Sequence, residues 1–171
     1  EINMDGNSRN VTKKSDHIET SQNPVDFEDW PEELVKEMRQ SHNNGCVGSV
    51  LVSETSKVRV WHLRLPPGYR CPFHRHVNPY FWSSHNDGRA RNYFSSGVIK
   101  EVNHFAGETR HFYYGEDEYM LHSVENIGET ELLFTTVEFI DGENAPLDIP
   151  DSYRLKAVSY THLRAHETVR N

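Results

Sequence analysis

The sequence predicts an all-β sandwich or barrel with one hydrophobic core. Its 171 residues suffice for one domain and are too few for two ordinary ones. From residue 58 onward, short segments rich in aromatic and β-branched residues alternate with Gly, Pro, Asn and Asp turns. Turns that recur about every 8 to 12 residues are typical of all-β domains. No repeat of about 20 to 50 residues is present, which disfavours propellers and solenoids.

A short helix is expected ahead of the strands, within a lead-in over residues 27–46. Residues 29–33 give this helix an acidic first turn, with Pro31 near the first helical position. Leu34 and Met38 stand four residues apart, so they lie on one helix face. The polar His-Asn-Asn-Gly stretch that follows should end the helix.

Seven or eight strands are expected after the helix. Residues 58–65 alternate in character and stop at a Pro-Pro-Gly turn, which indicates a strand followed by a turn. Residues 73–83 form a second, aromatic-rich strand that ends before Asp87-Gly88, a dipeptide typical of hairpins. The other expected strands cover residues 89–94, 98–104, 109–114, 119–124 and 131–140.

The two ends of the chain are not expected to join the barrel. Residues 1–26 are polar with scattered apolar positions, which predicts a disordered tail in which Met4 is the real start. Residues 142–156 are expected to form a C-terminal extension. Residues 157–171, AVSYTHLRAHETVRN, resemble a translated sequencing-adaptor read-through of the kind found in environmental, or metagenomic, assemblies. An ordinary frayed tail is the alternative for this segment.

The composition restricts the classes of function. Lys and Arg number 18 against 26 Asp and Glu, and the net charge of -8 argues against a nucleic-acid or anionic-membrane surface. No apolar run approaches the ~18 residues of a membrane-spanning helix, and no secretory segment is present. Cys46 and Cys71, the only cysteines, are compatible with packed thiols in a reducing compartment. We therefore expect a cytoplasmic protein whose partner is a small molecule.

Two histidines on one strand point to a metal site. His74 and His76 are two residues apart, so their side chains project from the same strand face about 6 to 7 Å apart at Cα. Such a pair can chelate one ion if another strand supplies a third ligand. His122 is the best candidate for that ligand, because it lies mid-strand between two glycine turns. His104 and His111 are the alternatives if the strand register differs.

The histidine pair alone is a weak signal, because strand histidines often face solvent or stack on aromatic rings. Two observations strengthen it. Gly68 and Pro72 bracket a turn just before the pair. The segment of His122 follows 46 residues after His76, which leaves enough chain for two or three strands to return to the same wall.

These residues resemble the first motif of the cupin superfamily. That motif runs Gly, five residues, His-x-His, three or four residues, Glu, six residues, Gly. Gly68, His74, His76 and Gly88 all fall in register with it. The position of the motif glutamate is occupied by Phe81.

The second cupin motif is matched in part. It ends in His, three residues, Asn, which His122 and Asn126 fit, while Asp117 and Tyr119 replace its upstream Pro and Gly. The resemblance covers residues 47–141 and implies a cupin-type jelly-roll double-stranded β-barrel. The chain most resembles small single-domain cupins that are associated with β-alanine degradation, which also tend to lack the glutamate. Cupins often dimerise, so a homodimer is a further expectation.

Loss of the glutamate leaves three neutral imidazoles as the implied ligands, His74, His76 and His122. Such a site suits one divalent transition metal, Fe, Zn, Ni or Mn, and keeps positions open for water or substrate. Because the charge of the ion is then less neutralised, it should favour an anionic ligand such as a carboxylate.

Several other side chains are candidates for the site. Tyr80 shares the face of the histidine pair and could act as an oxygen ligand or proton donor, and Trp82 could line the pocket. The alternative for both is an ordinary place in the core. Arg64, Arg91 and Arg110 lie in expected strands, where an inward guanidinium would bind a carboxylate and an outward one would pair with Glu or Asp.

Two functions follow from the resemblance. The first is a metal-dependent enzyme of oxygenase, isomerase or lyase type that acts on a small carboxylate-bearing molecule. The second is a non-catalytic binding module or sensor that holds a small ligand without metal, which the missing glutamate favours. The sequence leaves both open.

Overall fold

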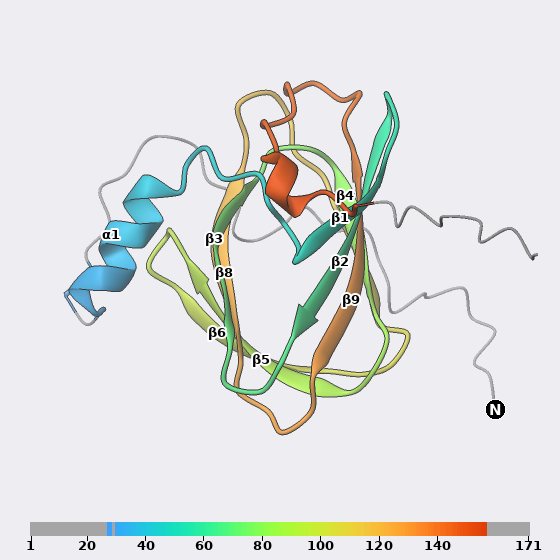
Figure 1. Cartoon of the computed structure of the whole chain (residues 1–171). Coiled ribbons are helices and arrows are strands. Elements are labelled where there is room, and N and C mark those ends of the chain that lie inside the picture. Colours follow the sequence, from blue (N-terminus) through green and yellow to red (C-terminus); the bar gives the residue numbers. More distant parts are fainter. Residues whose placement is uncertain (1–26, 29, 157–171) are drawn as a thin grey trace, which may run out of the picture.

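A computed structural model describes residues 27, 28 and 30–156 of the chain (Figure 1). The expected disordered tail over residues 1–26 and the expected read-through over residues 157–171 lie outside the described residues. No helix in the described part of the chain is long and apolar enough to cross a membrane.

Helix, strands and one 3-10 turn follow one another in a simple order. The helix comes first, nine strands follow, and the 3-10 turn comes last among the described residues. Their bounds are α1 (Glu32–Gln40), β1 (Val50–Glu54), β2 (Val58–Leu65), β3 (Arg70–His76), β4 (Tyr80–Ser84), β5 (Gly88–Phe94), β6 (Ile99–His104), β7 (Thr109–Phe112), β8 (Met120–Asn126), β9 (Leu132–Phe139) and η1 (Asp151–Tyr153).

The strands form two antiparallel sheets that face each other. The five-stranded sheet has the order β1-β2-β9-β4-β7, and the four-stranded sheet has the order β3-β8-β5-β6. Strands far apart in the sequence, such as β2 and β9, therefore lie side by side (Figure 1). Without the edge strand β1, this is the eight-strand pattern of a jelly roll. The predicted all-β jelly-roll barrel with a short N-terminal helix is confirmed.

The expected strand over residues 73–83 is in fact two strands in different sheets. The chain leaves the four-stranded sheet after His76 and enters the five-stranded sheet at Tyr80. Pro79 lacks an N–H for a continuous ladder, and the buried Asn78 instead donates its side-chain amide to the Asn144 carbonyl at 2.9 Å. Alternation alone could not reveal this crossing, because both strands continue the same inward and outward pattern.

The turn that leads into β3 depends on a glycine. Gly68 has a φ of 81°, in the left-handed region that side chains with a Cβ adopt at a cost. The Tyr69 amide donates to the Pro66 carbonyl at 3.1 Å and closes the turn, with Pro67 at the position where proline is favoured. The Pro-Pro-Gly sequence thus sets the point where β3 begins.

Helix α1 covers the outer face of the four-stranded sheet beside β3 (Figure 1). Met38 from the helix forms a buried cluster with Phe73 of β3 and Leu121 of β8, both of which are fully buried. The strands β3 and β8 are thus packed on both faces. This placement explains why Phe73 and Leu121 are apolar although both face away from the interior of the barrel.

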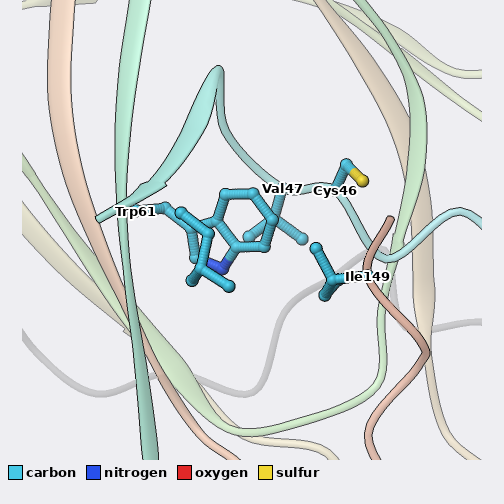
Figure 2. Packing of buried hydrophobic residues seen from close by; sticks show 5 residues of the cluster. Cys46, Val47, Trp61 and Ile149 are labelled. Atoms are coloured by element: carbon cyan, nitrogen blue, oxygen red, sulfur yellow. The ribbon is translucent and has the colours of Figure 1, made fainter. Parts of the chain in front are cut away.

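A second cluster packs inside the barrel around Trp61 of β2 (Figure 2). The indole is fully buried against Cys46, Val47 and Ile149, which come from the segments before β1 and after β9. Its Nε1 donates to a carboxylate oxygen of Glu138 at 2.8 Å. Val47 also lines the cavity described next, so this cluster supports one side of it.

Candidate metal centre

The three expected ligands lie on two neighbouring strands of the four-stranded sheet. His74 of β3 stands directly opposite His122 of β8, and His76 is two residues further along β3. The side chains converge so that one ligand atom from each lies within 4.8 Å of the others. His74 and His76 are almost fully buried, and His122 is partly buried.

The spacing of the ring nitrogens fits a shared ion. Nε2 of His76 and Nε2 of His122 are 3.1 Å apart. Two imidazole nitrogens bound at about 2.1 Å to one ion, at right angles, would be about 3.0 Å apart. The rings therefore need little movement to hold one cation between them.

A β-bulge orients the ring of His74. The pairing of β3 with β8 shifts between Cys71 and His74, where β3 has one extra residue. Nδ1 of His74 lies 2.8 Å from the Pro72 carbonyl oxygen inside this bulge. Because a carbonyl only accepts, Nδ1 carries the proton, and Nε2 keeps its lone pair for the cavity.

Burial keeps the histidines in the form that binds metals. It lowers the pKa of His74 from 6.5 to about 4, although the hydrogen bond to Pro72 opposes this change. Burial and the neighbouring histidines hold the pKa of His76 well below 6.5. These rings are therefore neutral at neutral pH, as metal ligation requires.

The histidines line a cavity of about 80 Å³ between the two sheets, called the histidine cavity below. This space is large enough for several water molecules or a small ligand. The four-stranded sheet contributes the three histidines together with Asn92, His104 and Val124, and the five-stranded sheet and its lead-in contribute Val47, Leu63, Tyr80, Trp82, Phe134 and Thr136.

Tyr80 lies against the centre. Its ring stacks on His76 with centroids 4.1 Å apart and on Phe112 at 4.7 Å. Burial, with a contribution from Tyr114, raises the pKa of Tyr80 well above 10, so the phenol keeps its proton. Phe81, at the position of the motif glutamate, instead packs against His111 with centroids 5.2 Å apart and is absent from the cavity lining.

Trp82 lines the histidine cavity, whereas the arginines expected to bind a carboxylate lie elsewhere. Arg64 has 74% of its side chain exposed and pairs with Glu131 at 2.6 Å. Arg91 pairs with Glu101 at 2.8 Å. Strand alternation turns both guanidinium groups outward, so the expectation that they reach this cavity is corrected here.

The other side chains considered from the sequence fall outside the ligand set. Arg110 binds Glu108 at 2.8 Å. Cys71 lies with its Sγ 3.7 Å from Nδ1 of His74, but burial raises the pKa of this thiol to about 12, so it is not a thiolate ligand. His111 packs outside the cavity on Phe81.

His104 belongs to the cavity lining although the sequence suggested it only as a substitute ligand. Among the described residues, it is not a member of the metal-ligating group. Its Nδ1 instead contacts the buried Glu108 at 2.8 Å. The signal available in the sequence was an acidic residue four positions after a histidine, across a glycine turn.

Comparisons with known proteins find similar solved structures. No family model matches the chain, and no curated protein matches it. A cupin domain from Bordetella pertussis Tohama I is 24% identical, with 51% of this chain and 85% of that chain covered and a TM-score of 0.45. A protein with a double-stranded β-helix domain from Klebsiella pneumoniae is 20% identical, with 65% and 90% covered and a TM-score of 0.45. A cupin-superfamily sugar phosphate isomerase from Silicibacter pomeroyi is 20% identical, with 49% and 51% covered and a TM-score of 0.37.

The strand order of this chain is that of a jelly roll, which is the fold that the resemblance to cupins implies. The narrower resemblance to cupins associated with β-alanine degradation stays a prediction.

Proposed function

We propose that His74, His76 and His122 bind one divalent transition-metal ion and that the barrel is a metal-dependent enzyme for a small carboxylate-bearing molecule. The observation that carries this proposal is the convergence of three imidazoles within 4.8 Å at a cavity between two sheets. Among the described residues no carboxylate belongs to this converging group, and a site of imidazoles alone suits Fe, Zn or Ni.

The ion itself would provide the positive charge that attracts the substrate. Among the described residues that line the histidine cavity, none is Lys or Arg. Three neutral ligands leave the charge of the ion uncompensated, so a carboxylate is the favoured occupant of its open positions. When bound, such an ion polarises a substrate oxygen or activates water or oxygen, which suits isomerase, lyase or oxygenase chemistry.

Side chains of the five-stranded sheet, opposite the histidines, would orient the carboxylate-bearing substrate. Tyr80 offers a phenol that keeps its proton beside His76, where it can donate a hydrogen bond. Trp82 and Phe134 pack edge to face, with centroids 5.2 Å apart, and give the cavity an apolar side. A carboxylate with a short apolar group would match both surfaces.

Elemental analysis of the purified full chain tests the metal site. We expect about one equivalent of transition metal, which is lost in a His74→Ala, His76→Ala double variant. A His62→Ala, His85→Ala double variant is the matched control, because neither residue lines the histidine cavity. Adding metal should raise the melting temperature, since about 2.7 kcal/mol is gained when the free metal is 100 times Kd.

A different result would favour a binding module. Metal-free protein whose melting temperature stays constant on addition of Fe, Zn, Ni and Mn would contradict the metal proposal. The barrel would then hold a small ligand without an ion.

A further inference from the structure

A fourth histidine reaches the histidine cavity, from a strand that carries none of the other three. His104 ends β6, has 8% of its side chain exposed, and lines the same cavity as the three ligands. Among the described residues it stands outside the group whose ligand atoms converge. Its ring is therefore available for a task other than ligation.

A buried carboxylate fixes which nitrogen of His104 carries a proton. Nδ1 lies 2.8 Å from Oε2 of Glu108, whose side chain is only 3% exposed. The other oxygen of Glu108 accepts from Nε of Arg110 at 2.9 Å, which holds the carboxylate in place. An ionised carboxylate only accepts, so Nδ1 donates and a neutral ring keeps its lone pair on Nε2.

Two aromatic side chains fix the plane of the same ring. Trp82 meets His104 edge to face with centroids 5.2 Å apart, and Phe134 does so at 5.0 Å. Both also line the histidine cavity. Rotation of the imidazole would break the Glu108 bond and both ring contacts, so Nε2 is held in one direction.

Few other groups in the lining could accept a proton. Asn92 and Thr136 carry an amide and a hydroxyl, which are weak bases. The ring of Tyr80 is stacked on His76, and its phenol keeps its proton. The converging nitrogens of the three proposed ligands are directed at the proposed ion. Nε2 of His104 is the remaining imidazole nitrogen of the described lining.

We infer that His104 is the catalytic base and acid of this cavity and that Glu108 is its positioning residue. The inference rests on the proposed function, because the substrate is a carboxylate held at the ion. Nε2 takes a proton from the carbon next to a carbonyl of that substrate, so the C–H bond breaks and an N–H bond forms. The electron pair of the broken bond stays on the substrate, and the proton on Nδ1 keeps its hydrogen bond to Glu108. The proton taken up by Nε2 can then return to a carbon of the substrate. No oxidant or second reactant is needed.

Hydrogen exchange of a small 2-oxo acid tests this step. Metal-loaded full chain is incubated in D₂O with pyruvate or 2-oxobutanoate, and NMR follows loss of the C3 proton signal. We expect exchange that slows by about 100-fold or more in His104→Ala, the usual effect of losing a general base. The matched control His62→Ala should exchange at the wild-type rate, because its side chain lies outside the cavity.

Chemical rescue separates catalysis from a structural role. Added imidazole can enter the space left by His104→Ala and should restore at least a tenth of the wild-type rate. His104→Gln, which fills the space without a base, should not be restored. Both variants should contain the same metal, in the same amount, as the wild type. This control shows that the three proposed ligands and the fold are intact.

Glu108→Gln tests the positioning role by a readout that needs no turnover. ¹⁵N NMR of the wild type should show His104 in one tautomer, protonated at Nδ1. The variant should show a mixture, because the Gln amide can either donate to Nδ1 or accept from it.

Three results would overturn the inference: unchanged exchange in His104→Ala, absence of exchange by metal-loaded wild type, or failure of imidazole to restore exchange in His104→Ala. Metal content is measured on the same samples. A chain that binds no metal fails the proposed function, whereas a metal-loaded chain with a dispensable His104 fails only the present inference.

Discussion

At the level of single residues, three side chains of this barrel have hydrogen-bond partners that fix the positions of their protons. The Pro72 carbonyl holds Nδ1–H of His74, and Glu108 holds Nδ1 of His104. In the Trp61 cluster, the indole N–H donates to Glu138. In His74 and His104, these bonds leave Nε2 as the nitrogen without a proton. The bond from Trp61 places the carboxylate of Glu138 in the core of the barrel.

Glu138 makes folding stability depend on pH. Burial raises its pKa from 4.5 to about 7, although the Trp61 bond and Arg59 oppose this rise. The folded protein therefore holds this proton more tightly than the unfolded chain does. The resulting stability is fully present below pH 4.5, falls as the pH rises toward 7, and is lost above that value.

We predict that Glu138→Gln removes this dependence. The difference in free energy of unfolding, variant minus wild type, should rise by about 3 kcal/mol between acidic pH and pH 8. The rise should occur between pH 4.5 and about 7, at about 1.4 kcal/mol per pH unit. Urea unfolding at several pH values measures the difference. Glu131→Gln, at an exposed ion pair, is the control and should show little change with pH. A difference for Glu138→Gln that stays flat from pH 5 to pH 8 would contradict the assignment.

At the level of elements, α1 supports the strand that carries two ligands. Met38 packs against Phe73, which lies next to His74 in β3 but on the opposite face. The helix thus covers the outer side of the wall whose inner side holds the histidines. Its amphipathic pattern was readable from the sequence, but the strand that it covers was not, because that contact joins distant segments.

We predict that Met38→Ala lowers the free energy of unfolding by about 2 to 5 kcal/mol, the usual cost of emptying such a core position. Lys36→Ala, on the exposed side of α1, should stay within about 0.5 kcal/mol. Chemical denaturation of both variants measures these values. Equal effects at the two positions would show that the helix does not stabilise the wall.

The elements also show where the sequence stops being informative. The His-x-His spacing predicts that both side chains share a face, and they do, because alternation is a local property. The bulge before His74 gave no comparable signal, and neither did the crossing at Pro79. The bond between His104 and Glu108 depends on how a turn folds back, which spacing alone does not determine.

At the level of the whole molecule, all three proposed ligands belong to one sheet. His74, His76 and His122 come from β3 and β8, while Tyr80 faces them from the five-stranded sheet. The fold was predictable because turns and alternation recur along the chain. The outward direction of Arg64 and Arg91 was not, since a one-residue difference in strand phase reverses it.

This arrangement predicts where a bound metal protects the backbone. Zn²⁺ at 100 times Kd should slow amide exchange about 100-fold in β3 and β8, wherever opening breaks the site. Amides of β2 and β9 should change much less, because no proposed ligand lies on those strands. Hydrogen–deuterium exchange with mass spectrometry distinguishes this pattern from uniform protection of both sheets, which would contradict it.

The confinement of the ligands to one sheet divides the barrel into two parts that can change separately. Leu63 and Thr136 face the histidines from the opposite sheet and contribute no ligand atom. Substitutions there can alter the shape and polarity of the chamber while the anchoring rings stay as they are. Selectivity can therefore be redesigned, or drift during evolution, without rebuilding the metal centre.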